Sequence, residues 1–171
     1  MRFDDRLLKW IEPEDNPRTT VYGTIASGLV IAAADPTTTN YSSIVLATSV
    51  AVASYWVAHG YAHWVGERLE RNDSPGSARR SRHRLAQALA HEWPLAEGAS
   101  IPLLALVVTW ATGATLAVAE TVALASATAA LAAFEVAAGL RRHVRPPQLL
   151  ANAAVGLLLG SALFAVKNVL H

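Results

Sequence analysis

Long apolar segments, each of a length that can cross a lipid bilayer as a helix, occupy most of this 171-residue chain. A transmembrane helix needs about 20 mainly apolar residues, because a helix rises about 1.5 Å per residue and the hydrocarbon core is roughly 30 Å thick. Apolar residues make up 53% of the chain, which is typical of a membrane protein. The sequence therefore predicts an all-α, polytopic membrane helix bundle. We place five spans at residues 19–35, 43–67, 95–112, 115–140 and 148–170.

Two charged segments lie outside these spans. Residues 1–18 combine charged side chains with apolar ones at helical spacing, which predicts an amphipathic helix on the membrane surface. Residues 68–84 are strongly basic and contain a clear turn, so we expect a cytoplasmic loop there, and residues 85–93 resume a helical pattern. The lipid bilayer is thus the first partner that the sequence predicts.

Lys and Arg residues are distributed unevenly between the connections. They precede the first span and fill the second-to-third and fourth-to-fifth connections, whereas the other two connections contain none. The positive-inside rule then predicts a cytoplasmic N-terminus and an outside C-terminus. Because topology explains the basic residues, nucleic acid is not an expected partner. The absence of cysteine excludes disulfides and thiolate metal sites.

The second span carries polar side chains at every fourth position, namely Tyr55, His59, His63 and Glu67. Residues four apart lie on the same face of a helix, so these four side chains form one stripe. An ionisable group in hydrocarbon costs roughly 2.5–3.5 kcal/mol on insertion scales. We therefore expect the stripe to face a partner helix, a cavity or a pathway, with its first three members at membrane depth.

The histidine pair allows three interpretations. Two histidines at positions i and i+4 can bind one divalent ion, as they do in helical zinc sites. Imidazole also titrates near neutral pH and can relay protons, in which case Tyr55 and Ser27 are further candidates on the pathway. In the third interpretation, His59 and His63 only form hydrogen bonds that fix helix packing.

A metal site needs at least one further ligand. Glu67 and Glu135 are the leading candidates, because both lie toward the cytoplasmic half. His91 and Glu92 are also available, but adjacent helical residues point about 100° apart. We therefore expect one of these two to face the second span and the other to face water.

Several other residues have simpler interpretations. Glu120, Lys167 and Asn168 are read as charged or polar residues at the outside ends of their spans. Gly156 and Gly160 form a small-xxx-small pattern that is typical of helix packing in lipid, either within one chain or between two copies. No nucleophile motif, phosphate-binding loop or dinucleotide fingerprint occurs in the sequence.

Four short motifs resemble the vacuolar iron transporter family. Residues 27–30 read Ser-Gly-Leu-Val, like the family's Asp-Gly-Leu-Val, and residues 62–67 end in Gly-Glu, like its Ser-Met-x-x-Gly-Glu. Residues 98–103 match a Gly-x-x-x-Pro-Leu pattern, and residues 139–142 match a Gly followed by basic residues. The resemblance implies five spans and a homodimer. It also places Ser27 and His63 at positions where the family has an Asp and a Met ligand.

The leading hypothesis is a transporter-like protein for a divalent transition-metal ion such as Zn²⁺ or Fe²⁺, with proton coupling as one variant. The first alternative is an accessory or scaffold subunit of a membrane complex, in which other membrane subunits are the partners. A membrane-embedded metal-dependent hydrolase ranks third, because the sequence shows only two well-placed ligands where such a site needs three.

Overall fold

The computed structural model describes residues 17–70 and 78–170, and within these residues the chain is helical with no strand. The predicted all-α class is thus confirmed for this part of the chain. The amphipathic helix expected over residues 1–18 falls almost entirely outside the described residues. The helices are α2 (Pro17–Ala32), α3 (Tyr41–Glu70), α4 (Ala78–His91), α5 (Trp93–Ala111), α6 (Leu116–Arg141) and α7 (Pro146–Leu170).

Four of these helices, α3, α5, α6 and α7, are long and apolar enough to cross a membrane. Their lengths and composition are those of a multi-pass membrane protein. Helix α2 coincides with the first predicted span but has 16 residues, fewer than a typical crossing. Helix α5 stops at a left-handed glycine, Gly113, whose φ of 81° is a common helix-ending conformation.

The connection between α3 and α5 is more helical than the sequence suggested. Helix α3 continues to Glu70, and α4 already begins at Ala78, so the basic segment predicted as a loop over residues 68–84 is helical at both of its ends. Ala and Arg are both strong helix formers, and they dominate residues 78–84. Pro102 lies inside α5 without ending it.

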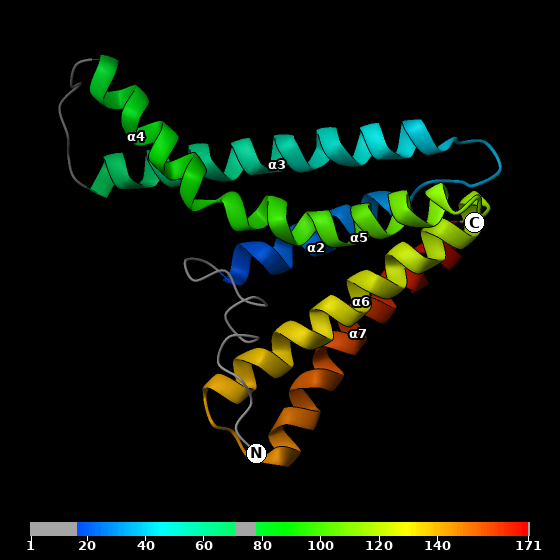
Figure 1. Ribbon diagram of the computed structural model, residues 1–171. Coiled ribbons are helices and arrows are strands. Elements are labelled where there is room, and N and C mark those ends of the chain that lie inside the picture. The colour runs from blue at the N-terminus through cyan, green and yellow to red at the C-terminus, as the bar shows by residue number, and fades with distance from the viewer. Residues whose placement is uncertain (1–16, 71–77, 171) are drawn as a thin grey trace.

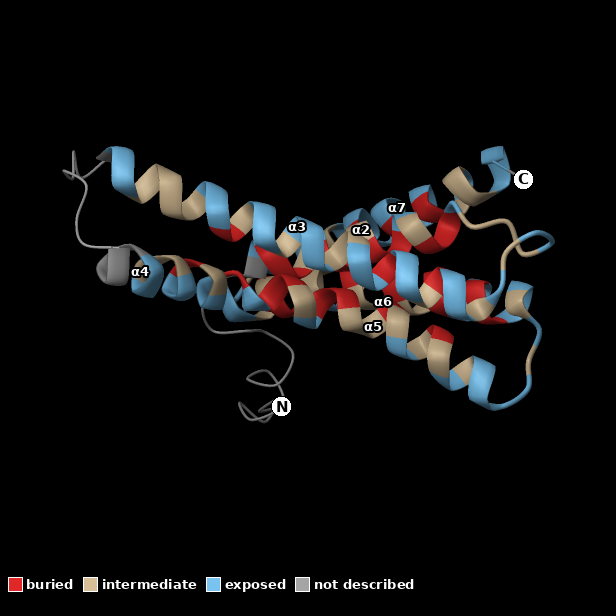
Figure 2. Cartoon of the chain, turned by 90° about the horizontal axis from the view of Figure 1, so that it is seen from above, coloured by how far each residue is buried: buried red, intermediate tan, exposed pale blue. Residues whose placement is uncertain are grey.

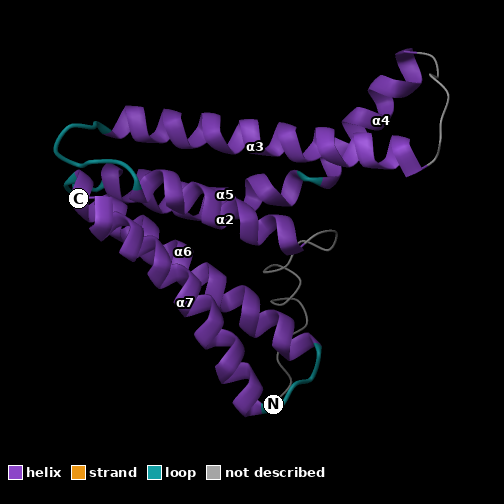
Figure 3. Ribbon diagram, turned by 180° about the vertical axis from the view of Figure 1, so that it is seen from behind, coloured by secondary structure: helices purple, strands orange, loops and turns teal. Residues whose placement is uncertain are grey.

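The helices form two arms. Helices α2, α3 and α5 lie side by side in one arm, and α6 and α7 form an antiparallel hairpin in the other (Figure 1). The arms meet where residues 33–40, residues 112–115 and the end of α7 gather, and we call this the narrow end. They diverge toward the wide end, which carries α4, the end of α3 and the α6–α7 turn (Figure 3).

The hydrophobic core lies toward the narrow end, where the arms meet (Figure 2). Its largest members are fully or almost fully buried: Ile31, Ile44, Leu106, Leu124 and Leu163. The hydroxyl of Tyr41 donates to the carbonyl of Ala114 at 2.6 Å and ties the start of α3 to the α5–α6 connection. Many large apolar side chains of α3 and α7 stay exposed, as expected of helix faces that contact lipid.

Close helix contacts depend on glycines. A Cβ atom added at Gly98 of α5 would lie 2.0 Å from the carbonyl oxygen of Thr20 of α2, and one at Gly23 would lie 1.9 Å from that of Leu95. Gly156 and Gly160 of α7 press in the same way against α6. These two glycines therefore pack within the chain, which is the role of small residues between helices in lipid.

Candidate functional site

The polar stripe of α3 divides into two groups in the structure. The ring of His59 lies 4.4 Å from that of Tyr55 and 6.3 Å from that of Tyr22 on α2, measured between ring centroids. His59 therefore belongs to an aromatic cluster between α2 and α3. One turn further along, His63 faces α4 and α5 instead.

His63 meets His91 and Glu92 at the junction of α4 and α5. One ligand atom from each of these residues lies within 4.8 Å of the other two. The Nδ1 atom of His63 is 3.9 Å from Oε1 of Glu92, and the rings of His63 and His91 are 5.0 Å apart. We call these three residues the junction triad. Within the described residues they form the one group of three His, Asp or Glu ligands at such spacing.

One of His91 and Glu92 was expected to face α3 and the other to face water, and Glu92 is indeed buried while His91 is exposed. Their ligand atoms nevertheless lie close enough to share one ion. Helix α4 ends at His91, and Glu92 follows it with φ of −90° and ψ of 6°, outside both helices. The amide of Glu92 still donates to the carbonyl of Leu89 at 3.2 Å, while its own carbonyl accepts from Leu95. The 100° rule holds within one continuous helix, and Glu92 lies between two helices, so the rule does not keep the two ligand atoms apart here.

Contacts one turn before the triad fix this geometry. The indole Nε1 of Trp56 donates to the carbonyl of Leu89 at 2.9 Å. The side chain of Leu89 packs onto Gly60, where an added Cβ would lie 2.5 Å from the Leu89 Cδ2 atom. The rings of Trp56 and Trp93 meet edge to face at 5.9 Å. The last turn of α4 is thus held against α3, which positions the triad.

Glu92 is the least ordinary member of the triad. It is only 5% exposed, and its Oε2 atom has no hydrogen-bond partner among the described residues. A buried carboxylate oxygen without a hydrogen-bond partner is costly, and a bound cation removes much of that cost. The donor set of two imidazoles and one carboxylate therefore fits a divalent transition-metal ion.

The spacing of the triad is slightly wider than a closed metal site. A tetrahedral zinc ion with ligand bonds of about 2.0–2.1 Å holds its ligand atoms roughly 3.3 Å apart. The widest triad distance would therefore close by up to about 1.5 Å around an ion, which requires small side-chain rotations within the triad. A fourth position around such an ion would remain for a water molecule.

Glu67 lies on the opposite side of the His63 ring. Its Oε1 atom is 3.5 Å from Nε2 of His63, while Nδ1 faces Glu92. A carboxylate on the far nitrogen of a metal-bound histidine fixes the ring orientation and raises its basicity. The structure therefore favours a positioning role for Glu67 over direct ligation.

Replacing Glu67 by alanine is expected to weaken Zn²⁺ binding by roughly 10–100-fold, the usual cost of losing such an orienting partner. The affinity would be measured by competition with a fluorescent chelator on detergent-purified protein. Glu135→Ala serves as the matched control and should leave the affinity unchanged. An affinity loss in the control equal to that in Glu67→Ala would contradict the assignment.

The triad lies at the boundary of the apolar layer. Helix α5 has 19 residues and rises about 28 Å, which is close to the hydrocarbon thickness, so its start at Trp93 marks one edge of that layer. Glu92 immediately precedes this edge, and the side chain of His63 beside it is 37% exposed. The part of α3 that could cross a membrane, Tyr41–Leu69, includes His63, so the place of His63 at membrane depth stays a prediction.

Two other predicted site residues lie elsewhere. Ser27 is fully buried in α2, and its hydroxyl donates to the carbonyls of Gly23 and Thr24, so its hydrogen bonds stay within its own helix. Glu135 lies toward the wide end of α6, in the other arm, and does not belong to the junction triad. The structure thus does not bring Glu135 together with His63.

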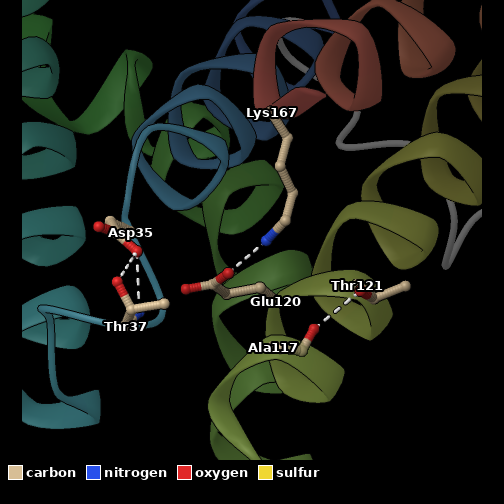
Figure 4. Close-up of polar contacts among 6 residues, drawn as sticks. All are labelled: Asp35, Thr37, Ala117, Glu120, Thr121 and Lys167. Carbon is tan, nitrogen blue, oxygen red and sulfur yellow. Dashed lines mark hydrogen bonds and ion pairs between the residues drawn. The ribbon is translucent and has the colours of Figure 1, made fainter. Parts of the chain in front are cut away.

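The sequence analysis missed a buried ion pair at the narrow end. Glu120 of α6 is fully buried and pairs with the ammonium of Lys167 on α7, as Figure 4 shows. Glu120 does lie near the end of its helix, as the sequence suggested, but its burial and its pairing with Lys167 were not predicted. The register of the hairpin could have revealed this pair, because the same antiparallel register that places Gly160 against Thr128 places Lys167 beside Glu120.

Comparison with protein-family models, with curated proteins and with solved structures finds no match to this chain. The likeness to the vacuolar iron transporter family therefore stays an expectation drawn from short motifs. A function for this membrane protein has to be argued from its own residues.

Proposed function

We propose that this chain is a multi-pass membrane protein that binds a divalent transition-metal ion at the junction triad and moves it across the bilayer. One observation carries the proposal: the ligand atoms of His63, His91 and Glu92 converge within 4.8 Å, and the buried carboxylate has an unpartnered oxygen. Imidazole ligands favour Zn²⁺, Fe²⁺, Co²⁺ or Ni²⁺ over Mg²⁺ and Ca²⁺. The ion is the cargo in this proposal.

We assign the wide end to the cytoplasm. The narrow-end connections, residues 33–40 and 112–115, contain no Lys or Arg, whereas basic residues lie at the start of α2, the end of α3, the start of α4 and the α6–α7 turn on the other side. Helix α2 is counted as the fifth span, because it packs along α5 and its 16 residues cover about 24 Å. The N-terminus is then inside and the C-terminus outside.

The shape of the bundle suggests how an ion would move. An ion from the cytoplasm would exchange water for the triad ligands and neutralise Glu92. Beyond the triad, the buried hydroxyls of Thr20 and Thr48 have no partner among the described residues and offer oxygen atoms inside the bundle. Passage would require the arms, which meet at the narrow end, to separate there, as in alternating access.

Proton coupling follows from the ligand chemistry. A histidine binds metal only in its neutral form, so metal and protons compete for the same ring nitrogens. Metal affinity should therefore fall as the pH drops into the range in which imidazoles are protonated. Release on the more acidic side of a membrane would then be favoured.

Zn²⁺ uptake into proteoliposomes is the test of this proposal. With a zinc-sensitive dye trapped inside, wild-type protein should give faster uptake than protein-free vesicles, and His63→Ala should reduce uptake to that background. His83→Ala, which changes an exposed histidine of α4, is the matched control and should retain wild-type uptake. Wild-type uptake no faster than in protein-free vesicles would contradict the transport proposal.

The same ligand set supports a second candidate, a metal-dependent hydrolase at the membrane surface. Two histidines and one carboxylate with an open fourth position are the ligands of several zinc hydrolases. This candidate ranks lower because Glu67 faces the far nitrogen of His63 and not the position of the ion. Metal-dependent hydrolysis of ester substrates without Zn²⁺ uptake would favour it.

A further inference from the structure

The narrow end holds a charge pair that the proposed metal site does not use. Glu120 is 0% exposed and its carboxylate pairs with Lys167, whose side chain is 17% exposed (Figure 4). The two residues lie on antiparallel neighbours, α6 and α7, near the ends where both helices approach residues 33–40. A buried pair of this kind contributes little stability compared with apolar residues, because desolvation of the two charges offsets their attraction.

One oxygen of Glu120 remains available. Lys167 contacts Oε2, whereas Oε1 is buried and has no hydrogen-bond partner among the described residues. The neighbouring residues on α6, Ala119, Ala123 and Leu124, are fully buried apolar side chains. In Figure 4 the second oxygen points away from the ammonium, toward the connection that carries Asp35. A buried carboxylate oxygen without a hydrogen-bond donor is unsatisfied, and a proton bound to it would remove the charge.

The titratable or charged groups that the described residues place at this end, besides Glu120, include Lys167, Asp35 and Tyr41. Lys167 supplies the ammonium from α7. Asp35 lies in the α2–α3 connection, where its carboxylate accepts hydrogen bonds from the amide and hydroxyl of Thr37 and from the hydroxyl of Thr38. Tyr41, at the start of α3, donates its hydroxyl hydrogen to Ala114. Asp35 and Tyr41 thus make hydrogen bonds of their own, while Oε1 of Glu120 has none.

The chemistry of this site favours a proton over a metal ion. A metal ion needs several ligand atoms, and the carboxylate of Glu120 offers one unpartnered oxygen. A proton needs one oxygen atom. We propose that Glu120 is a proton-binding site of the narrow end, with Lys167 as its resident counter-cation.

Proton binding would change the pair in a defined way. A proton from water forms an O–H bond at Oε1, Lys167 keeps its own charge, and the attraction between the two residues weakens. Lys167 is three residues from the end of α7, so its long side chain can then extend to the aqueous boundary. The narrow end would lose one of the contacts between α6 and α7.

Infrared difference spectroscopy tests this site directly, because a protonated carboxyl group absorbs apart from a carboxylate. Acidification of detergent-solubilised wild-type protein should produce a carboxyl band that Glu120→Gln lacks. In Lys167→Met the band should appear after a smaller acidification than in the wild-type protein, because the cation that favours the charged carboxylate is gone. Glu135→Gln, another α6 carboxylate variant, is the matched control and should keep the wild-type band.

Each single variant leaves one charge of the pair without its partner, and the protein could then fail to fold. The double variant Glu120→Gln/Lys167→Met avoids this problem, because it removes both charges together. It should fold and show no pH-dependent carboxyl band from this site. A wild-type band that persists unchanged in Glu120→Gln and in the double variant would overturn the proposal and leave the pair a structural contact. No metal is added, so the result is independent of whether the junction triad binds an ion.

Discussion

Replacing His63 by alanine is expected to reduce Zn²⁺ affinity by more than the roughly 10–100-fold that the loss of an orienting partner costs, because a ligand itself is removed. His63 is the one member of the junction triad that lies on α3, and its Nδ1 atom faces the buried carboxylate of Glu92. Without it, His91 and Glu92 would offer two ligands from one short segment. The affinity is measured by titration against a chelating dye.

His59→Ala is the informative control for this prediction. His59 lies on the same stripe, one turn from His63, but its ring packs against Tyr55 and Tyr22. The structure therefore predicts that His59→Ala keeps wild-type affinity for Zn²⁺. Equal losses in the two variants would show that the stripe binds as an i, i+4 pair and that the triad is not the site.

Gly98→Ala is expected to lower the free energy of unfolding by about 3 kcal/mol or more, at the upper end of the usual cost of overpacking. An added Cβ would lie 2.0 Å from the backbone oxygen of Thr20, and backbone cannot rotate away as a side chain can. Helices α2 and α5 would have to separate. The free energy of unfolding is measured by chemical denaturation in detergent. The yield of monodisperse protein is a second indicator of the loss.

Gly66→Ala is a control variant in which the stability is expected to stay unchanged or to rise. Gly66 is also helical, but no atom lies within 4 Å of a Cβ added there. Alanine exceeds glycine in helix propensity by up to about 1 kcal/mol, so this variant should be neutral or slightly more stable. If both substitutions had the same effect, close packing at Gly98 would not explain the result.

The regular features of the fold could be predicted from the sequence, because they depend on local sequence patterns. Apolar length predicted the four long helices, and the four-residue spacing correctly placed His63 and Glu67 within contact distance on α3. The Gly156 and Gly160 pattern indicated helix packing, and the structure shows that its partner is α6.

The junction triad could not be predicted from local sequence patterns. Its formation depends on the break at Glu92, and the sequence there shows no glycine, only Pro94 two residues later. A continuous helix would have turned His91 and Glu92 apart, and the pairing of α4 with α3 depends on the tertiary contact between Gly60 and Leu89. The burial of Glu120 likewise follows from how α6 and α7 pair.

Titration of purified wild-type protein with Zn²⁺ tests the central claim most directly. The junction triad predicts saturable binding of one ion per chain, with lower affinity at acidic pH because protons compete for the imidazoles. Absence of saturable binding across neutral pH would contradict the metal site, and the histidines would then be packing residues of a membrane scaffold.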